Sequence, residues 1–334
     1  MNKFHLINSE EMVVVAKKIY HDSTLEHLLT SYIETLKAGS PTDPIIFWVS
    51  QKAKEIASGF NKKHEKTVSI GTVKRLLKKL KYGYRKQSKQ LATGVYKNRN
   101  LQFEIITNLM LIMSCKSPII SIDCKKKEVL GNLYREGKCY SQEPIKVYDH
   151  DYSHLSEGKV IPHGIYDMQA NIGYIFIGNS TESADCITDN LRWWWINYGK
   201  DLYPDASTLL LLCDAGGANS YRHHIFKDRL LKLTKELGIS IVVSHYPPYA
   251  SKWNPIEHRL FCHVYQAMSG VVFSDYEIIK ERIEATSTQT RLTVVVKLNL
   301  AEYQKRIKVD KEISKDDRIQ RHPKIPELNY RVNP

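Results

Sequence analysis

The sequence predicts an α/β fold: a mixed sheet with flanking helices, preceded by a small all-α domain. The chain has 334 residues and 42% hydrophobic content, enough for one full-sized core and a smaller module. Positive charge is concentrated before residue 100, and segments with strand and helix periodicity alternate after it. We therefore expect a basic helical region over residues 1–97, a main domain over 98–290 and a C-terminal extension over 291–334.

The excess positive charge of +13 lies mostly in one segment. Residues 62–99 contain thirteen Lys or Arg and a single acid, Glu65, which gives this segment a net charge of +12. A solvated surface could carry such a run. However, its concentration on and after one predicted helix favours contact with nucleic-acid phosphates.

Several classes of protein are excluded by the composition. The six cysteines form no C-x-x-C pair, so neither a zinc ribbon nor a disulfide framework is indicated. No apolar run approaches the roughly 20 residues that span a bilayer, and the first residues lack the apolar core of a signal peptide. We expect a cytoplasmic, nucleoid-associated protein with no membrane partner.

Two amphipathic helices are predicted in the basic region. The first covers about residues 45–60, and the second covers 69–81, with Ser69 as its cap and apolar residues repeating at i, i+3, i+4 and i+7. This pattern suits a helix-turn-helix over about residues 45–82, although an ordinary amphipathic helix has the same stripe. Residues 85–99 are predicted to form a basic linker. The residues of this region expected to bind DNA are Lys74, Arg75, Lys78, Lys79, Lys81 and Arg85.

Beyond residue 100, strands and helices are predicted to alternate. The predicted strands cover residues 118–123, 160–166, 172–177, 208–213 and 239–244. The predicted helices cover residues 102–113, 182–198, 221–237 and a segment beginning at Pro255. From residue 118 onward, three strands followed by helix, strand, helix, strand and helix is the order of a ribonuclease H-like α/β fold.

Three acids fall at the ends of these predicted elements. Asp123 ends the first strand, Asp214 directly follows the fourth, and Glu257 lies in the first turn of the last helix. Because adjacent strand ends meet at one edge of an open α/β sheet, we expect the three carboxylates to converge. Carboxylates are the ligands that Mg²⁺ or Mn²⁺ prefers, and two such ions suit phosphoryl transfer. The acids therefore predict a two-metal site.

Each acid also has an ordinary structural explanation. Asp123 could cap the following turn, and Asp214 could form an Asx turn before Gly216. Glu257 could close a capping box with Asn254. A shared metal site explains why all three acids lie at the termini of one fold, and we favour it.

The sequence blocks around these acids resemble a known family. The blocks are Ser121-Ile122-Asp123-Cys124-Lys125-Lys126-Lys127-Glu128, Gly164-Ile165-Tyr166-Asp167, Asp214-Ala215-Gly216-Gly217-Ala218-Asn219-Ser220-Tyr221-Arg222, His245-Tyr246-Pro247-Pro248 and Ser251-Lys252-Trp253-Asn254-Pro255-Ile256-Glu257-His258-Arg259-Leu260-Phe261. Over roughly residues 65–330 the chain is similar to the Rhodopirellula-type DDE transposases of bacterial insertion sequences. The resemblance implies a ribonuclease H-like catalytic domain, a divalent metal, and Asp123, Asp214 and Glu257 as catalytic, metal-binding acids. It also implies a helix-turn-helix region that binds double-stranded DNA at element ends.

Basic and aromatic residues next to the acids are further candidates for DNA contact. Lys125 follows Asp123 and could guide phosphates, although a lysine run is commonly a solvated face. Lys252 and Arg259 flank Glu257, and Trp253 could stack on an unpaired base. The tryptophans of the segment 193–195 are more numerous than a surface stripe needs, so we expect at least two of them in the core.

These features together predict an insertion-sequence transposase. We expect metal-assisted attack of water to free a 3′-hydroxyl at the element's terminal repeats, and that hydroxyl then to attack target DNA. Several copies of the chain are expected to assemble around the two ends. Two other functions stay open: a truncated, catalytically inactive DNA-binding remnant that represses its element, and a ribonuclease H-like host nuclease that cuts without joining.

Overall fold

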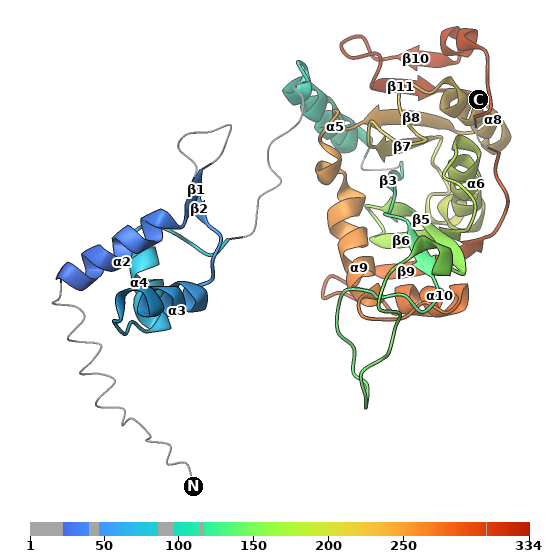
Figure 1. Cartoon of the computed structure of the whole chain (residues 1–334). Helices are drawn as coiled ribbons and strands as arrows, with labels where there is room; N and C mark the ends of the chain where they lie inside the picture. The colour runs from blue at the N-terminus through green and yellow to red at the C-terminus, as the bar shows by residue number, and fades with distance from the viewer. Residues whose placement is uncertain (1–22, 40–46, 86–95, 114–116, 305) are drawn as a thin grey trace. The chain divides into compact units, whose positions relative to one another are not determined.

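The chain forms two compact units, residues 1–90 and residues 91–334 (Figure 1). The computed structural model describes residues 23–39, 47–85, 96–113, 117–304 and 306–334. Within these ranges, no helix is long and apolar enough to cross a membrane.

The first unit is a small helical domain with a two-stranded sheet. Helices α2 (Ser23–Thr35), α3 (Ala53–His64) and α4 (Ile70–Lys79) pack around one core, and β1 (Lys37–Gly39) pairs antiparallel with β2 (Phe47–Val49). The fully buried members of this core are Leu29, Ile33, Ile56, Phe60 and Val73.

The two helices predicted in the basic region are only partly as expected. The second is observed as α4, and the Ser69 hydroxyl accepts a hydrogen bond from the Thr72 amide at 3.1 Å, as a cap should. The first begins later than predicted, because residues 47–49 form a strand instead. Their sequence Phe-Trp-Val has high β-propensity and finds a partner in residues 37–39. Residues 45 and 46, and most of the predicted linker, lie outside the described residues.

The second unit is built on a nine-stranded mixed sheet, which confirms the predicted α/β class. Its strands are β3 (Ile119–Cys124), β4 (Glu128–Leu130), β5 (Gly158–Asp167), β6 (Ile172–Gly178), β7 (Thr208–Cys213), β8 (Ser240–His245), β9 (Thr293–Asn299), β10 (Ile319–Arg321) and β11 (Asn329–Val332). They are ordered β10-β11-β8-β7-β3-β5-β6-β9, with β4 paired to β5. Strands β3, β7 and β8 are parallel neighbours, and β5 runs antiparallel to β3.

Helices cover both faces of this sheet (Figure 1). They are α5 (Arg99–Met113), α6 (Ala184–Trp194), the short α7 (Lys200–Leu202), α8 (His224–Leu237), α9 (Cys262–Met268) and α10 (Tyr276–Glu284). Helices α6 and α8 pack on the face that carries Ile120 and Ile122 of β3. Helices α9 and α10 pack on the opposite face, which carries Ile175 and Ile177. Helix α5 packs on that opposite face against Ile119.

The segment 291–334, which we expected as an extension, belongs to the sheet. It supplies β9 at one edge and β10 and β11 at the other. Strand β11 pairs with β8 from Asn329↔Ser244 to Val332↔Ile241, and Val332 is fully buried. These strands are short or carry charged residues, so their sequences alone do not distinguish them from a tail.

The tryptophan-rich helix is observed near its predicted bounds. Helix α6 is followed by a π-helical turn, Trp195–Gly199. Trp194 is fully buried and Trp195 is 7% exposed, so the expectation that two of these tryptophans are core residues is confirmed.

Candidate active site

Asp123 and Asp214 lie at the ends of two neighbouring parallel strands. The register of β3 and β7 pairs Ile122 with Cys213, and each acid is the next residue along its strand direction. Both strands are buried and mostly apolar up to this point, so the carboxylates are the first charged groups where the chain leaves the core. One Asp123 oxygen accepts a hydrogen bond from the Cys124 amide at 2.8 Å.

Glu257 is brought to these two acids by a buried side-chain anchor. The Asn254 side chain donates to the Ile122 carbonyl at 2.9 Å and accepts from the Ser121 hydroxyl at 2.5 Å. That hydroxyl in turn accepts from the Ile256 amide at 3.0 Å. Because Asn254 is fully buried, it ties the segment that carries Glu257 directly to β3. Glu257 then opens a π-helical turn that runs into α9.

The bonds of Asn254 to β3 argue against a capping box between Asn254 and Glu257. The Asn254 side chain is committed to β3, and only its backbone carbonyl accepts from the Glu257 amide, at 3.0 Å. The carboxyl of Glu257 interacts with Asp123 instead of with the backbone of Asn254.

The three acids share one electrostatic environment. Burial, and then the charges of Asp214 and Glu257, raise the pKa of Asp123 to about 8. Burial also raises the pKa of Asp214 and that of Glu257. A hydrogen bond from Asp123 and the charges of His258 and Lys125 oppose the shift at Glu257. Carboxyls gathered in this way accumulate negative charge that a cation would relieve.

The donor chemistry of this cluster fits a hard divalent cation. One oxygen of Asp214 is buried and has no hydrogen-bond partner among the described residues, an arrangement that proteins avoid unless a ligand or ion uses the atom. In the side-chain positions seen in the described ranges, no group of three His, Cys, Asp or Glu residues could hold a metal ion. An ion would therefore have to draw these mutually repelling carboxylates closer together.

Two residues of this site were missed in the sequence. Glu182, which precedes α6, interacts electrostatically with Asp123 and with Asp214, and it accepts from the Ala218 amide at 3.3 Å. His245 is fully buried at the end of β8 and contacts the Asp214 carbonyl at 2.9 Å. In the sequence, Glu182 was assigned only to the start of a helix. His245 lies in one of the blocks that resemble the family, but its partner, the Asp214 carbonyl, is 31 residues away in the sequence.

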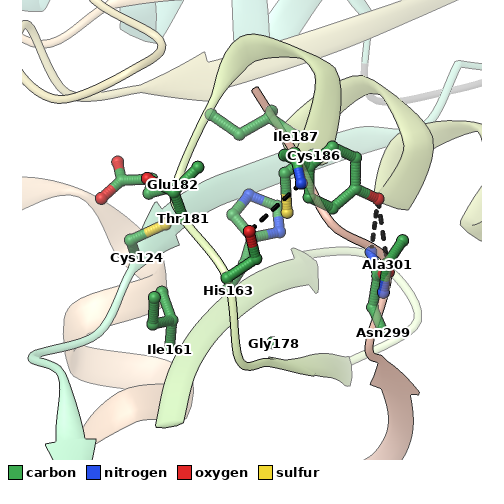
Figure 2. Close-up of a pocket in the computed structure, with 12 residues that line it drawn as sticks. Cys124, Ile161, His163, Gly178, Thr181, Glu182, Cys186, Ile187, Asn299 and Ala301 are labelled. Carbon is green, nitrogen blue, oxygen red and sulfur yellow. Dashed lines mark hydrogen bonds between the residues drawn. The ribbon is translucent and has the colours of Figure 1, made fainter. Parts of the chain in front are cut away.

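A small pocket behind the acids is lined by Cys124, Glu182 and His163 (Figure 2). Its volume of about 10 Å³ has room for little more than one water-sized sphere, so it is no substrate site. His163 is buried in its wall beside the Asn190 amide, at 3.1 Å. Burial lowers the pKa of His163 to about 3 and that of His245 to about 4, so both imidazoles are neutral at physiological pH.

The buried His163 predicts a pH dependence of stability. Its folded pKa of about 3 lies below the ordinary histidine value of 6.5, so between these values the unfolded chain binds more protons. Stability contributed by neutral His163 is present above pH 6.5 and is lost as the pH falls towards 3. When the pH is lowered from 7 to 5.5, the unfolding free energy of the wild type should fall by about 1 kcal/mol more than that of His163→Gln. Urea unfolding at the two pH values measures this. Parallel losses in both proteins would contradict it.

The predicted DNA-contact residues of the second unit lie on two sides of the acids. Lys125 forms an ion pair with Glu128 at 3.3 Å and lies 5.2 Å from the centre of the Tyr265 ring, so it is largely enclosed. Trp253 is 52% exposed and packs edge-on against Phe103 of α5 at 6.1 Å. Lys252 and Arg259 are exposed near it in sequence, on the segment that precedes α9.

The basic residues of the first unit are divided between two surfaces. A groove of about 950 Å³ is lined by Lys74, Lys81 and Arg85 together with the half-exposed rings of Phe47 and Trp48. The other predicted residues of this unit, all exposed, are Arg75, Lys78 and Lys79. Of these, Arg75 and Lys79 line a different pocket, where Lys79 forms an ion pair with Glu26 of α2.

Solved structures with a related arrangement are complexes and domains of the Mos1 transposase. The Mos1 paired-end complex with the left transposon end has 17% identity and a TM-score of 0.42, covering 77% of this chain and 68% of that chain. The Mos1 mariner paired-end complex with Mn has 16% identity and a TM-score of 0.43, covering 70% and 65%. The Mos1 mariner catalytic domain has 14% identity and a TM-score of 0.39, covering 57% and 81%. These similarities are too distant to carry an argument about chemistry.

Sequence comparison identifies the family. No curated protein sequence matches the chain at a significant level. The profile of the Rhodopirellula transposase DDE domain matches residues 28–334, nearly the whole chain, and so confirms the resemblance carried by the blocks around the acids. The chain belongs to the Rhodopirellula transposase DDE domain family.

Proposed function

We propose that the chain is an insertion-sequence transposase that cleaves DNA at element ends and joins the freed ends to target DNA. The observation that carries this proposal is the meeting of Asp123, Asp214 and Glu257 at one edge of the sheet. An edge with three desolvated carboxyls and one buried, unbonded carboxylate oxygen is suited to divalent ions.

Asp123, Asp214 and Glu257 are the residues that would hold Mg²⁺ or Mn²⁺, and we propose two ions. When bound, the ions would supply electrostatic stabilisation of the attacking and leaving oxygens of a phosphodiester. Asn254 and Ser121 hold Glu257 in register with the strand that carries Asp123. His245 fixes the carbonyl of Asp214 and so orients the turn that follows β7.

Two histidines near the acids are unsuited to proton transfer. His163 and His245 are buried, and their pKa values of about 3 and about 4 keep them neutral. We therefore assign neither imidazole the role of general base, and the proposed ions would supply the activation of water or of a 3′-hydroxyl.

We further propose that the first unit recognises double-stranded DNA at the element ends, as a helix-turn-helix with α4 as its recognition helix. Helix α4 presents Lys74 and Lys78 on an exposed face, and the first of these lines the groove with Phe47 and Trp48. The helix is ten residues long with a buried apolar side, as a helix lying in a major groove requires. Active complexes would contain several copies, so that two ends meet.

A strand-transfer assay on DNA that carries the flanking repeats tests the proposed function. With Mg²⁺ the chain should release ends with free 3′-hydroxyls and insert them into a plasmid, and EDTA should stop both steps. Binding of the repeats without any nicking would favour a catalytically inactive repressor. Nicking without joining would favour a ribonuclease H-like nuclease. Either result would contradict a transposase.

The groove of the first unit leads to a prediction about end binding. Changing Lys74 and Lys78 to Gln should weaken binding of repeat DNA about tenfold and reduce the salt dependence of log K by about 2, because two phosphate contacts are lost. Lys79→Gln is the matched control. The sequence also predicted DNA contact for Lys79, but the structure pairs it with Glu26 in a different pocket from Lys74, so we propose that its loss changes affinity less than twofold. Fluorescence anisotropy over a salt series measures both. Equal losses in the two proteins would contradict the assignment of this surface.

A further inference from the structure

The unit of residues 91–334 has a groove beside the acids, which we call the basic groove. It has a volume of about 760 Å³ and is lined by three segments: residues 181–185 at the start of α6, residues 217, 218 and 222–225 before and at the start of α8, and residues 304, 306–309 and 311 after β9, together with Lys127. Of these residues, only Lys127, Gly217, Ala218 and Arg222 belong to the blocks that carry the family resemblance, and none of the four was a candidate site residue. The groove is therefore a feature of the fold that the sequence did not reveal.

The basic groove carries unneutralised positive charge. Its arginines and lysines are Lys127, Arg222, Arg306, Lys308 and Lys311, and among the described residues none of them forms an ion pair. Of the two acids in its wall, Asp185 pairs with Arg229, so Glu182 is the one acid that faces the five cations. The net field inside the groove is consequently positive, as a polyanion requires.

The start of α8 adds to this positive field. No acid occupies the first turn of α8, and His223 gives it no side-chain cap. The pKa of His224 is lowered by burial and then by the charges of Lys227, Lys311 and Arg321, which confirms that cations surround this end of the helix. Free amides at a helix N-terminus and nearby cations both favour phosphate oxygens.

The position of the basic groove connects it to the candidate active site. Glu182 lines the groove and interacts electrostatically with both Asp123 and Asp214. The groove lies on the α6 and α8 side of the sheet, whereas Trp253 packs against α5, which covers the opposite face. Two DNA segments could thus reach the same acids from two sides. A joining reaction requires two DNA segments at one set of acids.

We propose that the basic groove binds the phosphodiester backbone of target DNA during strand transfer, an inference that rests on the proposed transposase function. Its lining offers cations and helix amides, and it contains no Phe, Tyr or Trp ring for base stacking. Phosphate contacts carry no sequence information, so such a groove accepts DNA of any sequence. The other flank, with Lys252 and the half-exposed Trp253, offers a ring on which an unpaired base at a cleaved element end can stack.

The first test compares end cleavage with strand transfer by the full chain. The variant Arg306→Gln, Lys308→Gln, Lys311→Gln, whose three positions lie outside the family blocks, should cleave element ends within twofold of the wild type. With precut ends that carry a free 3′-hydroxyl, it should insert into a plasmid at least tenfold more slowly. The control Lys200→Gln, Lys235→Gln removes two exposed lysines of α7 and the far end of α8 and should change neither rate. Equal loss of cleavage and transfer would mean that the groove holds the element end, and unchanged transfer would mean that it holds no DNA; either result overturns the proposal.

A second measurement separates this proposal from the proposed catalytic function, because it needs no catalysis. A photo-crosslinking amino acid at position 308, with position 235 as control, is irradiated in EDTA with a labelled random-sequence duplex and a labelled repeat duplex together. Crosslinking of the random duplex from position 308 but not from position 235 supports the groove. Crosslinks to the repeat duplex alone, or none to either, overturn it, even if the chain cleaves DNA normally.

Discussion

Replacing Asp214 by Ala is expected to abolish metal-dependent cleavage of element ends, with a loss of at least about 10³-fold, equivalent to roughly 4 kcal/mol of transition-state stabilisation. The reason is positional: Asp214 follows β7 beside Asp123, and one of its oxygens is buried without a hydrogen-bond partner in the described part of the chain. Removing it takes away one of the proposed metal ligands and breaks no hydrogen bond of that oxygen.

Binding and folding should survive this change. Burial raises the pKa of Asp214, so its ionised form is disfavoured in the folded protein, and the relief of this cost offsets the loss of its hydrogen bonds with the Gly216 amide and the Asn219 side chain. Asp214→Ala should therefore unfold at a urea concentration close to that of the wild type. Affinity for repeat DNA should stay within twofold. The matched control is Asp205→Ala, an exposed acid ahead of β7, which should cleave normally. Full cleavage by the Asp214→Ala protein would refute the assignment of the acids.

The parts of the structure that the sequence predicted are those that depend on residues close together in the chain. Strand β7 was predicted with its observed bounds, since Thr208 and five apolar residues in a row end at an acid. The start of α4 followed from Ser69, whose capping bond depends on a residue three positions away. Local periodicity and local hydrogen bonds leave their mark within one short window of sequence.

The parts that were missed depend on contacts between distant residues. The Ser121 hydroxyl and the Asn254 side chain are 133 positions apart, and only the folded sheet brings them together. Glu182 reads as the first turn of a helix until β3 and β7 are seen to end beside it. The edge strands β9 and β10 likewise gain their strand character from pairing with strands far away in the chain.

The buried Asn254 leads to the second large effect that we expect. Asn254→Ala should lower the unfolding free energy by about 2–4 kcal/mol, because the Ile122 carbonyl and the Ser121 hydroxyl both lose a buried partner. It should also reduce cleavage at least about 100-fold at a temperature where the variant is fully folded, since the segment that carries Glu257 is no longer held against β3. Asn197→Ala, at an exposed asparagine that bonds only the Trp193 carbonyl, is the control for both measurements.

The dependence of cleavage on Mg²⁺ distinguishes positioning from mere stability. If Asn254 positions Glu257, the variant should need a higher Mg²⁺ concentration for half-maximal cleavage, because one ligand of the proposed site is displaced. If Asn254 only stabilises the fold, the folded fraction should cleave at the wild-type rate with the wild-type Mg²⁺ requirement. The second result would remove the structural argument for Glu257 as a ligand. The argument for Asp123 and Asp214 would stand, because they lie at the ends of adjacent strands and need no anchor to meet.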